Sequence, residues 1–531
     1  MGKYRHHKKF VEFPLNSHPD FTNFKQLVDA NADTHPQETA FQFHHNKQLI
    51  TIMYQKFRDD IQTLCSYLFQ KGLFRSKIAV LGENSYEWIL TYFSVVMSNN
   101  IIVPIDKELS NDDIAYLLDF SGAELLVYAD SYADIADAML QGGHIKAALP
   151  MKDFPSILKI SPKSEITTNE YDLCSIIFTS GTTGKPKGVM LSQRNMVVDA
   201  VSGCKNVYFS GTSLLTLPLH HTFAFTAGVL VMLVYHVPIY INKSLRTFQA
   251  DMKLFRPQNM FLVPLYVETM YKNIWKTAEE QGKDKLLKRM IALSNLLRKF
   301  GIDLRRKMFK SVLDNFGGNL DLLVSGGAAI RQEYIDGMDD IGILVLNGYG
   351  ITECAPVVAV NRNKAYKSNS IGLPLICNKI KIEDGELCVK GDNVMLGYYQ
   401  DPSTTQAAIV DGWFKTGDLG YIDEDGFLCI TGRKKNLIIL SNGKNVSPEE
   451  LEEKILGIPY VEEVVVFADG ETITAEIFSA DSAGIQAAIT ELNRELPPYK
   501  RIQRVAFRDT PFEKTTTKKI RRSNLAQKEG H

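Results

Sequence analysis

The sequence is short of the features that mark several common classes of protein. Its seven cysteines are odd in number and widely spread, and no two of them form a CxxC pair. This spacing argues against a disulfide framework or a cysteine zinc site and predicts reduced thiols in a cytoplasmic protein. The net charge of −1 gives no bulk field that would attract nucleic acid, so any charged surface must be local.

Long uninterrupted hydrophobic runs are also missing. The basic N-terminus has no apolar stretch behind it, so we expect no signal peptide. The stretch 222–241 has about the length of a membrane span, but a glycine, a histidine and a proline interrupt it. We therefore predict a buried helix over about 224–236, a buried strand over 238–241 and a soluble protein.

Short apolar runs alternate with helical patterns through most of the chain. Residues 77–82 and 101–105 have the pattern of buried strands, and residues 86–99 and 112–122 have that of helices. This rhythm predicts an α/β fold with mixed, mainly parallel sheets covered by helices. From about residue 366, short strands and Gly/Asp turns indicate an antiparallel β module.

The pattern changes once more near Lys435. Helical and strand-like segments alternate over 448–509, which predicts a small α+β domain. We therefore divide the chain into an N-terminal domain, residues 1–434, and a C-terminal domain, residues 435–531.

The segment 175–189 carries the clearest chemical signal. A buried apolar strand runs into Thr-Ser-Gly-Thr-Thr-Gly-Lys-Pro-Lys-Gly, residues 179–188. Glycines let backbone N–H groups turn inward, hydroxyls donate to phosphate oxygens, and lysines neutralise charge, so this loop predicts a polyphosphate cradle. It is not a Walker A loop, because Pro186 stands where that pattern needs its second glycine.

This loop resembles the phosphate loop of the adenylate-forming, AMP-binding superfamily, which includes acyl-CoA synthetases, peptide-synthetase adenylation domains and firefly luciferase. The other motifs of the superfamily follow in order over nearly the whole chain. The resemblance implies that the protein uses ATP, Mg²⁺ and CoA and that its C-terminal domain is mobile. It also implies a set of ATP contacts: Thr179, Ser180, Gly181, Thr182, Thr183, Gly184, Lys187, Gly327, Ala328, Asn347, Gly348, Tyr349, Gly350, Thr352, Asp418, Arg433 and Lys519.

Residues 347–353, Asn-Gly-Tyr-Gly-Ile-Thr-Glu, resemble the second motif of the superfamily. The resemblance implies that Tyr349 stacks on adenine, Thr352 meets the α-phosphate and Glu353 holds Mg²⁺. An aromatic face suits a base, and a hard oxygen ligand suits magnesium. The glycine-rich turn 325–330 comes earlier in the chain and is similar to the adenine-side loop.

Two further motifs complete the implied nucleotide site. Asp418, in DGWFKTGDLG, matches the residue that grips the ribose hydroxyls, since a carboxylate can accept two hydrogen bonds. In TGRKKN, Arg433 would touch ribose or phosphate, and Lys435 falls at the hinge between the domains. An acid often follows this hinge in the superfamily, whereas here Asn436 follows, so we expect the local pairing to differ.

The loop after the hinge resembles the segment that swings in during thioester formation, with Gly443 and Lys444 on the CoA side. The last motif is the least regular. Lys519 aligns with the catalytic lysine of the superfamily, and Lys518 stands in place of its usual glycine.

The implied reaction joins two anions, because a carboxylate attacks the α-phosphorus of ATP and pyrophosphate leaves. Cations must offset the repulsion and stabilise the charge that develops in the transition state. The resemblance assigns this work to a catalytic set of Lys187, Thr352, Glu353 with its Mg²⁺, and Lys519.

The segment 217–225 resembles the acid-pocket motif of the superfamily. His221 takes the gating position, and Phe223 and Gly326 would line the pocket. A core histidine satisfied by the backbone is the plainer interpretation of His221. Domains that activate amino acids carry an aspartate in this segment and this chain has none, so an apolar acid is favoured.

Residues 263–270, followed by a long helical stretch over 271–315, look like the long-chain fatty acyl-CoA synthetase branch, from which Leu265 and Thr269 depart. We expect a medium- or long-chain fatty acid–CoA ligase, with a free-standing enzyme that loads an acyl carrier protein in trans as the alternative. Residues 281–310 contain ten Lys/Arg and two Asp. A solvated helix face is the plainer interpretation of this charge, and peripheral contact with an anionic membrane is the alternative.

Replacing Lys519 with alanine should abolish acyl-adenylate formation and spare thioester formation from supplied acyl-adenylate, because only the first half-reaction needs a cation at the carboxylate and the α-phosphate. ATP–pyrophosphate exchange measures the first half-reaction, and release of the CoA thioester measures the second. Lys518→Ala is the matched control. Equal loss of both half-reactions in Lys519→Ala would contradict the assignment.

Overall fold

The computed structural model describes residues 15–45, 48–161, 168–179, 186–440, 444–470, 472–479, 481–514, 520 and 522. The chain divides into two compact units. The first unit contains Met1–Lys379 and Lys390–Ile409, and the second contains Ile380–Val389 and Val410–His531. Much of the predicted antiparallel β module therefore groups with the C-terminal residues. The boundary at Lys435 stays a prediction.

A seven-stranded sheet lies in the first unit. In spatial order its strands are β18 (Gly397–Tyr398), β8 (Lys187–Ser192), β7 (Leu173–Thr179), β4 (Ile101–Pro104), β3 (Lys77–Leu81), β5 (Leu125–Tyr128) and β6 (Ala147–Pro150). The five strands from β7 to β6 are parallel, whereas β7, β8 and β18 pair antiparallel. The buried runs of the βαβα rhythm thus form the parallel part of the sheet.

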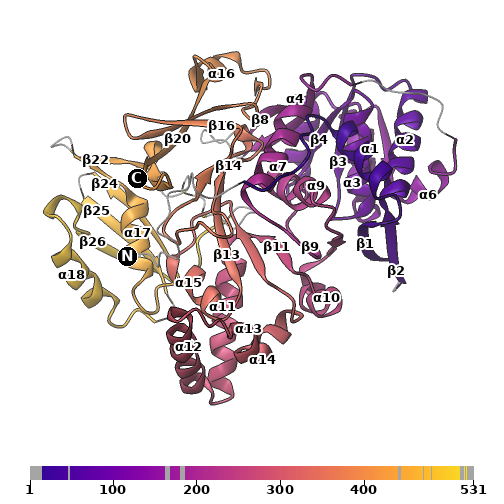
Figure 1. Ribbon diagram of the computed structural model, residues 1–531. Coiled ribbons are helices and arrows are strands. Elements are labelled where there is room, and N and C mark those ends of the chain that lie inside the picture. The colour runs from indigo at the N-terminus through magenta and orange to yellow at the C-terminus, as the bar shows by residue number, and fades with distance from the viewer. Residues whose placement is uncertain are drawn as a thin grey trace. The chain divides into compact units, whose positions relative to one another are not determined.

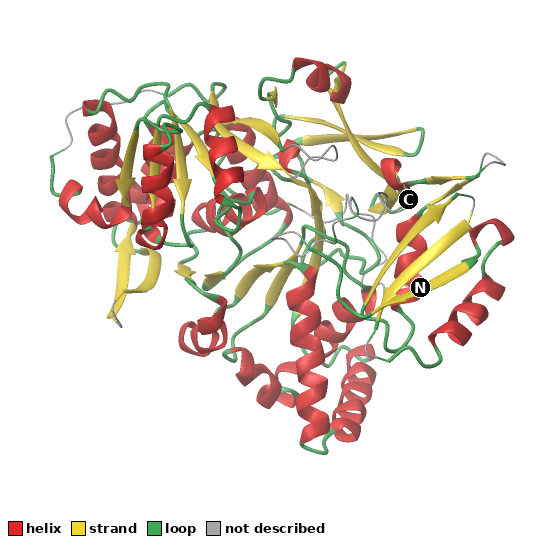
Figure 2. Cartoon of the chain, turned by 180° about the vertical axis from the view of Figure 1, so that it is seen from behind, coloured by secondary structure: helices red, strands yellow, loops and turns green. Residues whose placement is uncertain are grey.

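Helices pack along this sheet because strand side chains alternate between its two faces. Ala79 and Leu81 share a core with α4 (Asn111–Ser121) and α5 (Ala133–Gln141). Helix α3 (Tyr86–Met97) contacts β3 and β4. Figure 1 shows α3 and α4 beside β3 and β4, and Figure 2 shows helices and strands of the chain from behind.

A nine-stranded sheet completes the first unit. Its strands are, in spatial order, β15 (Leu373–Pro374), β14 (Val357–Val360), β13 (Leu344–Gly350), β12 (Leu322–Ser325), β11 (Asn259–Leu262), β9 (Ser213–Leu215), β10 (Ile239–Ile241), β1 (Thr39–His45) and β2 (Gln48–Met53). The six strands from β13 to β1 are parallel, and antiparallel strands flank them on both sides. The prediction of mixed, mainly parallel sheets is confirmed.

One face of this sheet carries the long helical insert. The helices α11 (Pro264–Glu280), α12 (Asp284–Lys299) and α15 (Gln332–Asp340) share a core with alternate residues of β11, including Met260 and Leu262. Two short helices, α13 (Arg305–Met308) and α14 (Lys310–Leu313), follow. Figure 1 shows α11 and α12 next to each other, and they are in contact.

The apolar stretch near residue 230 forms a buried helix and a strand, as predicted. It begins as α8 (Thr222–Phe225), continues as a π-helical turn over Thr226–Val231 and α9 (Met232–Val234), and then enters β10. In the described part of the chain, every helix is too short or too polar to cross a membrane. The remaining α-helices of the first unit are α1 (Phe24–Thr34), α2 (Tyr54–Gln70), α6 (Phe154–Ile157), α7 (Gln193–Asn206), α10 (Phe248–Phe255) and α16 (Pro402–Ala408).

The second unit combines two β structures with helices. A five-stranded sheet has the order β16 (Asn378–Glu383), β17 (Glu386–Gly391), β20 (Trp413–Ile422) and β19 (Ile409–Val410), with β21 (Leu428–Arg433) beside β20. After the short pair β22 (Ile438–Ile439) and β23 (Asn445–Val446) comes a three-stranded sheet. Its members are β24 (Glu463–Asp469), β25 (Thr472–Phe478) and β26 (Arg504–Arg508), accompanied by α17 (Pro448–Leu456) and α18 (Ile485–Glu495). The predicted α+β pattern over 448–509 is confirmed.

Candidate active site

The predicted phosphate loop joins the two strands of a β hairpin. Thr179 ends β7, Lys187 begins β8, and the two are direct cross-strand partners. The hairpin therefore fixes both ends of the loop next to each other. The predicted contacts Ser180, Gly181, Thr182, Thr183 and Gly184 lie outside the described residues.

Lys187 and Glu353 meet at one aromatic ring. The Nζ atom of Lys187 lies 5.0 Å from the centroid of the Tyr398 ring. The hydroxyl of Tyr398 donates a hydrogen bond of 2.9 Å to Oε1 of Glu353. The backbone N–H of Met395 donates to the carbonyl of Glu353 at 2.8 Å. Two residues predicted from separate motifs are thus brought together by Tyr398, which sequence reasoning missed.

The carboxylate of Glu353 fits the predicted magnesium site. It offers a hard oxygen on the short helical turn Thr352–Cys354, near the end of the phosphate hairpin. Within the described residues no three His, Cys, Asp or Glu side chains gather as a metal site. Mg²⁺ is commonly bound by one or two carboxylates, with water and substrate phosphates as the other ligands, so a single glutamate is a suitable anchor.

The acid-pocket motif adjoins the same region. The side chains of Thr222 and Thr352 are linked by a hydrogen bond of 3.4 Å between their Oγ1 atoms. The hydroxyl of Thr226 donates to the carbonyl of Ala355 at 2.9 Å. The start of helix α8 is therefore tied to the Thr352–Glu353 turn, although the two segments are 130 residues apart in sequence.

Phe223 and Gly326, both predicted to line the acid pocket, are in contact. A Cβ atom added to Gly326 would lie 3.1 Å from the Phe223 ring, so any larger residue would push on that ring. Phe223 also packs edge-to-face on Phe261 of β11, with 6.0 Å between ring centroids. His221 immediately precedes helix α8, and its ring lies 4.1 Å from that of His220.

His220 is a buried neutral imidazole. Burial and, to a lesser degree, the charge of Lys107 lower the pKa of His220 to about 3. Its Nε2 lies 3.5 Å from Oδ1 of Asp106, a carboxylate that would favour the charged imidazole. Because desolvation outweighs this attraction, we expect no ion pair between them at neutral pH.

The predicted adenine-side residues lie on β13 and beside it. The Nδ2 of Asn347 donates to the carbonyl of Ser370 at 3.1 Å, and the carbonyl of Asn347 accepts from Nδ2 of Asn361 at 3.0 Å. Tyr349 and Gly348 follow on the strand, opposite Ala359 and Val360 of β14.

Glycines occupy the end of this strand and the turn that follows β12. A side chain at Gly350 would collide with the carbonyl of Pro356. Gly327 has a φ of +86°, in the left-handed region that favours glycine, and Ala328 after it is exposed. The backbone therefore requires glycine at both positions, for lack of space at Gly350 and for the positive φ at Gly327.

The ribose-side residues form an ion pair within the second unit. Asp418 of β20 and Arg433 of β21 are cross-strand partners, and Nε of Arg433 lies 2.7 Å from Oδ1 of Asp418. The Asp418 side chain is 4% exposed and that of Arg433 is 43% exposed. Glu386 accepts from the N–H of Gly417 at 2.9 Å and pairs with Lys434 at 2.8 Å, which fixes the turn before Asp418.

The hinge and CoA-side predictions also fall in the second unit. Burial, followed by the charge of Arg433, lowers the pKa of Lys435. The Nδ2 of Asn436 donates to Oε1 of Glu449 at 2.6 Å, so the local pairing uses an acid further along the chain. Lys444 lies over the ring of Tyr499, with 4.4 Å from Nζ to the centroid. Gly443, Lys518 and Lys519 lie outside the described residues.

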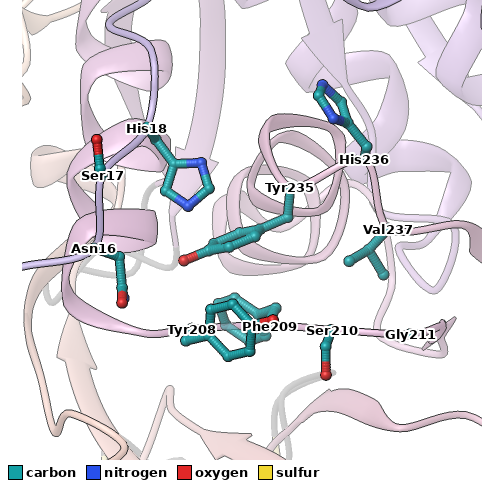
Figure 3. Close-up of a pocket in the computed structure, with 10 residues that line it drawn as sticks. All are labelled: Asn16, Ser17, His18, Tyr208, Phe209, Ser210, Gly211, Tyr235, His236 and Val237. Atoms are coloured by element: carbon teal, nitrogen blue, oxygen red, sulfur yellow. The ribbon is translucent and has the colours of Figure 1, made fainter. Parts of the chain in front are cut away.

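A cavity of about 440 Å³ opens elsewhere in the first unit (Figure 3). It contains none of the predicted site residues. The rings of His18, Tyr208 and Tyr235 lie along its walls, and burial lowers the pKa of His18. Its complete lining is Asn16, Ser17, His18, Tyr208, Phe209, Ser210, Gly211, Tyr235, His236 and Val237.

Comparisons with known proteins cover nearly the whole chain. The sequence model of the AMP-binding enzyme family matches residues 28–399, and that of the AMP-binding enzyme C-terminal domain matches residues 435–528. A long-chain-fatty-acid–CoA ligase of Mycobacterium bovis is 28% identical over 85% of this chain and 86% of its own length. One of Salmonella typhimurium is 27% identical over 97% of this chain and 96% of its own length.

Solved structures share the fold. An anthranilate CoA ligase in complex with anthranoyl-AMP superposes with a TM-score of 0.79 at 19% identity, covering 98% of this chain and 99% of that one. A fatty acyl CoA synthetase of Mycobacterium tuberculosis gives a TM-score of 0.69 at 21% identity, covering 96% and 98%.

His220 should make the protein sensitive to mild acid. The folded imidazole stays neutral down to about pH 3, whereas in the unfolded chain it takes up a proton below about pH 6.5. The unfolded state therefore binds more protons in this window, and stability falls as the pH is lowered through it. Between pH 7 and pH 5, the free energy of unfolding of His220→Phe should fall by about 2 kcal/mol less than that of the wild type.

Urea unfolding at both pH values measures the difference. His45→Gln, at an exposed position, controls for the loss of a histidine. Equal losses of stability in the wild type and His220→Phe would contradict the assignment of a buried neutral imidazole.

Proposed function

Because the chain belongs to the AMP-binding enzyme family, we propose that it activates a medium- or long-chain fatty acid with ATP and transfers the acyl group to CoA. The family match supports the formation of acyl-AMP. The names of the relatives, which are long-chain-fatty-acid–CoA ligases at 27–28% identity, support the fatty acid and the CoA acceptor. AMP and pyrophosphate are the other products.

One observation supports this function more than any other: the bond between Thr222 and Thr352. It joins the acid-pocket motif to the motif proposed to meet the α-phosphate. In-line attack requires the carboxylate and the α-phosphorus to be held within about 3–3.5 Å in the correct orientation. Together with the shorter bond from the Thr226 hydroxyl to the Ala355 carbonyl, this link helps to hold the two motifs in the fixed relation that such alignment needs.

The proposed site divides the work between its residues. Lys187 offsets the charge of the phosphates. Glu353 would hold Mg²⁺, which when bound would supply positive charge to stabilise the phosphate oxygens. Lys519 reaches the carboxylate and the α-phosphate. Asp418 and Arg433, already paired through one oxygen, take the ribose.

The second half-reaction needs a different set of residues. Lys435 is the proposed hinge about which the C-terminal domain turns once the acyl-adenylate has formed. Gly443 and Lys444 then come to the CoA side, where the thiol attacks the acyl carbon and AMP leaves. The contact of Lys444 with the Tyr499 ring gives the lysine a defined position, which supports this part of the proposal.

The pocket chemistry favours an apolar acid. Phe223 and Phe261 form an aromatic wall with Gly326 against it, while His221 takes the proposed gating position. Burying each methylene of an alkyl chain on such a surface contributes about 0.8 kcal/mol, so affinity should rise with chain length until the pocket is filled.

ATP–pyrophosphate exchange against straight-chain acids from two to eighteen carbons tests the substrate. Exchange should rise with chain length and stay low for acetate, because the pocket is apolar. Thioester formation is then compared with CoA and with a phosphopantetheinylated carrier protein as acceptor. Acyl transfer only to the carrier would replace the CoA ligase with the carrier-loading alternative, and exchange confined to short or amino acids would contradict the fatty acid.

We also propose that helix α12 contacts an anionic membrane surface. Its outward side bears an apolar stripe, in which Phe300 just after the helix is 75% exposed and Leu293 is 51% exposed. Lys285, Arg289 and Lys299 are exposed nearby and make no ion pair with any residue that the structure describes. A helix side that is both apolar and basic is typical of binding at an anionic lipid surface.

Other basic residues of this insert have structural partners. Arg298 lies 3.0 Å and Arg305 lies 2.8 Å from carboxylate oxygens of Asp339, so these two cations attach the insert to helix α15. The proposal is thus restricted to the outer stripe. All seven cysteines lie in the described part of the chain and none of them forms a disulfide there, which supports a reducing compartment such as the cytoplasm.

Co-sedimentation with vesicles tests the membrane contact. Binding should be stronger to vesicles with anionic lipid than to zwitterionic ones, by about 1 kcal/mol for each basic residue near the surface. Leu293→Ser with Leu296→Ser should weaken it further. Leu254→Ser is the control, because Leu254 is 59% exposed on helix α10. Vesicle binding that changes neither with the anionic lipid content nor with the double substitution would contradict the proposed membrane contact.

A further inference from the structure

Tyr398 lies between two side chains of opposite charge. Its hydroxyl donates to Oε1 of Glu353 at 2.9 Å, and Nζ of Lys187 lies 5.0 Å from its ring centroid. The residue is 7% exposed.

Lys187 and Glu353 would attract each other if nothing stood between them. Both are described, and no ion pair joins them within 4.0 Å in this part of the structure. A direct pair would occupy the ammonium that phosphate requires and the carboxylate that the metal requires. The aromatic ring instead offers the lysine a weaker partner, its π face, which the cation can leave at little cost when phosphate arrives.

We propose that Tyr398 is a positioning residue that keeps Lys187 and Glu353 apart and orients each for its own ligand. The ring holds the ammonium on the phosphate side. The hydroxyl fixes one carboxylate oxygen, which leaves the other to be directed at the metal. This inference rests on the proposed roles of Lys187 and Glu353.

The backbone around Tyr398 is held firmly enough for such a role. Tyr398 is the cross-strand partner of Val189 in β8, two residues after Lys187. Its N–H donates to Oγ1 of Thr405 at 2.8 Å. With Met395 bonded to the carbonyl of Glu353, the segment that carries the ring is attached both to the lysine strand and to the glutamate turn.

A buried polar pair secures the other end of the glutamate turn. Asp199 of helix α7 accepts the N–H of Val357 at 3.2 Å, and Nδ2 of Asn393 donates to the carbonyl of Val357 at 3.0 Å. Asn393 also donates to Asp199 at 3.0 Å. Val357 therefore has both backbone polar groups bound, so Glu353 cannot drift away from Tyr398 without breaking this arrangement.

Tyr398→Phe tests the hydroxyl and keeps the ring. The readout is the coupling between metal and nucleotide, measured by calorimetry as the ratio of the ATP Kd in EDTA to that in excess Mg²⁺. Loss of a hydrogen bond to a metal ligand commonly weakens metal affinity about tenfold or more, so the ratio should fall about tenfold. The ATP Kd in EDTA should not change, since Lys187 keeps its place.

Kinetics give a second readout that a general structural defect would not produce. In ATP–pyrophosphate exchange, the half-saturating concentration of free Mg²⁺ should rise about tenfold, while the KM for the acid is unchanged. Tyr398→Leu removes the ring as well and allows Lys187 to pair with Glu353. That variant should also weaken ATP binding in EDTA.

Tyr399→Phe is the matched control. This neighbouring tyrosine also uses its hydroxyl, donating to the carbonyl of Ser121 at 3.3 Å, and also has a lysine over its ring, Lys77 at 5.6 Å. Its side chain has no part in the proposed site, so the coupling ratio should equal that of the wild type. Circular dichroism and thermal unfolding show whether each variant is folded.

The outcomes separate this inference from the function beneath it. If Glu353→Gln abolishes the metal coupling and Tyr398→Phe does not change it, the positioning role is wrong and the proposed site stands. If Glu353→Gln keeps full coupling, the metal role of Glu353 is wrong and the inference falls with it. An equal loss of the coupling between Mg²⁺ and ATP in Tyr398→Phe and Tyr399→Phe would also overturn the inference.

Discussion

The antiparallel pairing of β18 with β8 is the contact on which the site of the first unit depends. It is only two residues long, Gly397 with Met190 and Tyr398 with Val189. Through it, a segment some 200 residues after the phosphate hairpin comes to lie against the strand that Lys187 begins. Glu353 is then reached from the same segment, by the hydroxyl of Tyr398 and the N–H of Met395. The same backbone contacts thus hold the Lys187 ammonium, the Tyr398 ring and the Glu353 carboxylate in fixed positions relative to one another.

Electrostatics explain why a fixed arrangement of these side chains favours the proposed reaction. The proposed reaction brings a carboxylate to a triphosphate, and both carry negative charge. Flexible lysines and glutamates could neutralise each other before the substrates bind, and a preorganised site avoids that loss. The neutral His220 and the aromatic wall around Phe223 add no further charge on the acid side. The proposed acid-binding region is therefore suited to burying an alkyl chain next to the strongly polar residues of the proposed reaction centre.

Much of the fold could be predicted from the sequence, and for clear reasons. The buried runs at 77–82 and 101–105 are too apolar and too short for anything but strands of a covered sheet, and the helices between them show the expected period. The apolar stretch after residue 222 was separated into helix and strand because a proline near its end stops a helix. The phosphate loop was found because glycines, hydroxyls and lysines in this order have few other uses, whereas the other motif residues were found through their resemblance to the superfamily.

The other features of the site depend on tertiary contacts that no local sequence pattern predicts. Tyr398 stands next to an equally aromatic Tyr399, and only the pairing of β18 decides which ring meets Glu353. Asp199 resembles any other helical aspartate until its burial against Val357 and Asn393 is known. The basic insert was recognised by its charge, but the division of that charge between inward pairs with Asp339 and an outer stripe follows from the packing of α12 and α13.

Gly350 sets a limit on how this part of the sequence can diverge. Because any side chain there would strike the carbonyl of Pro356, only glycine fits between Tyr349 and Ile351. Strand β13 and the turn that carries Glu353 can therefore vary little where they join. The proposed acid pocket around Phe223 and Gly326 does not use this junction, so its side chains are free of that constraint.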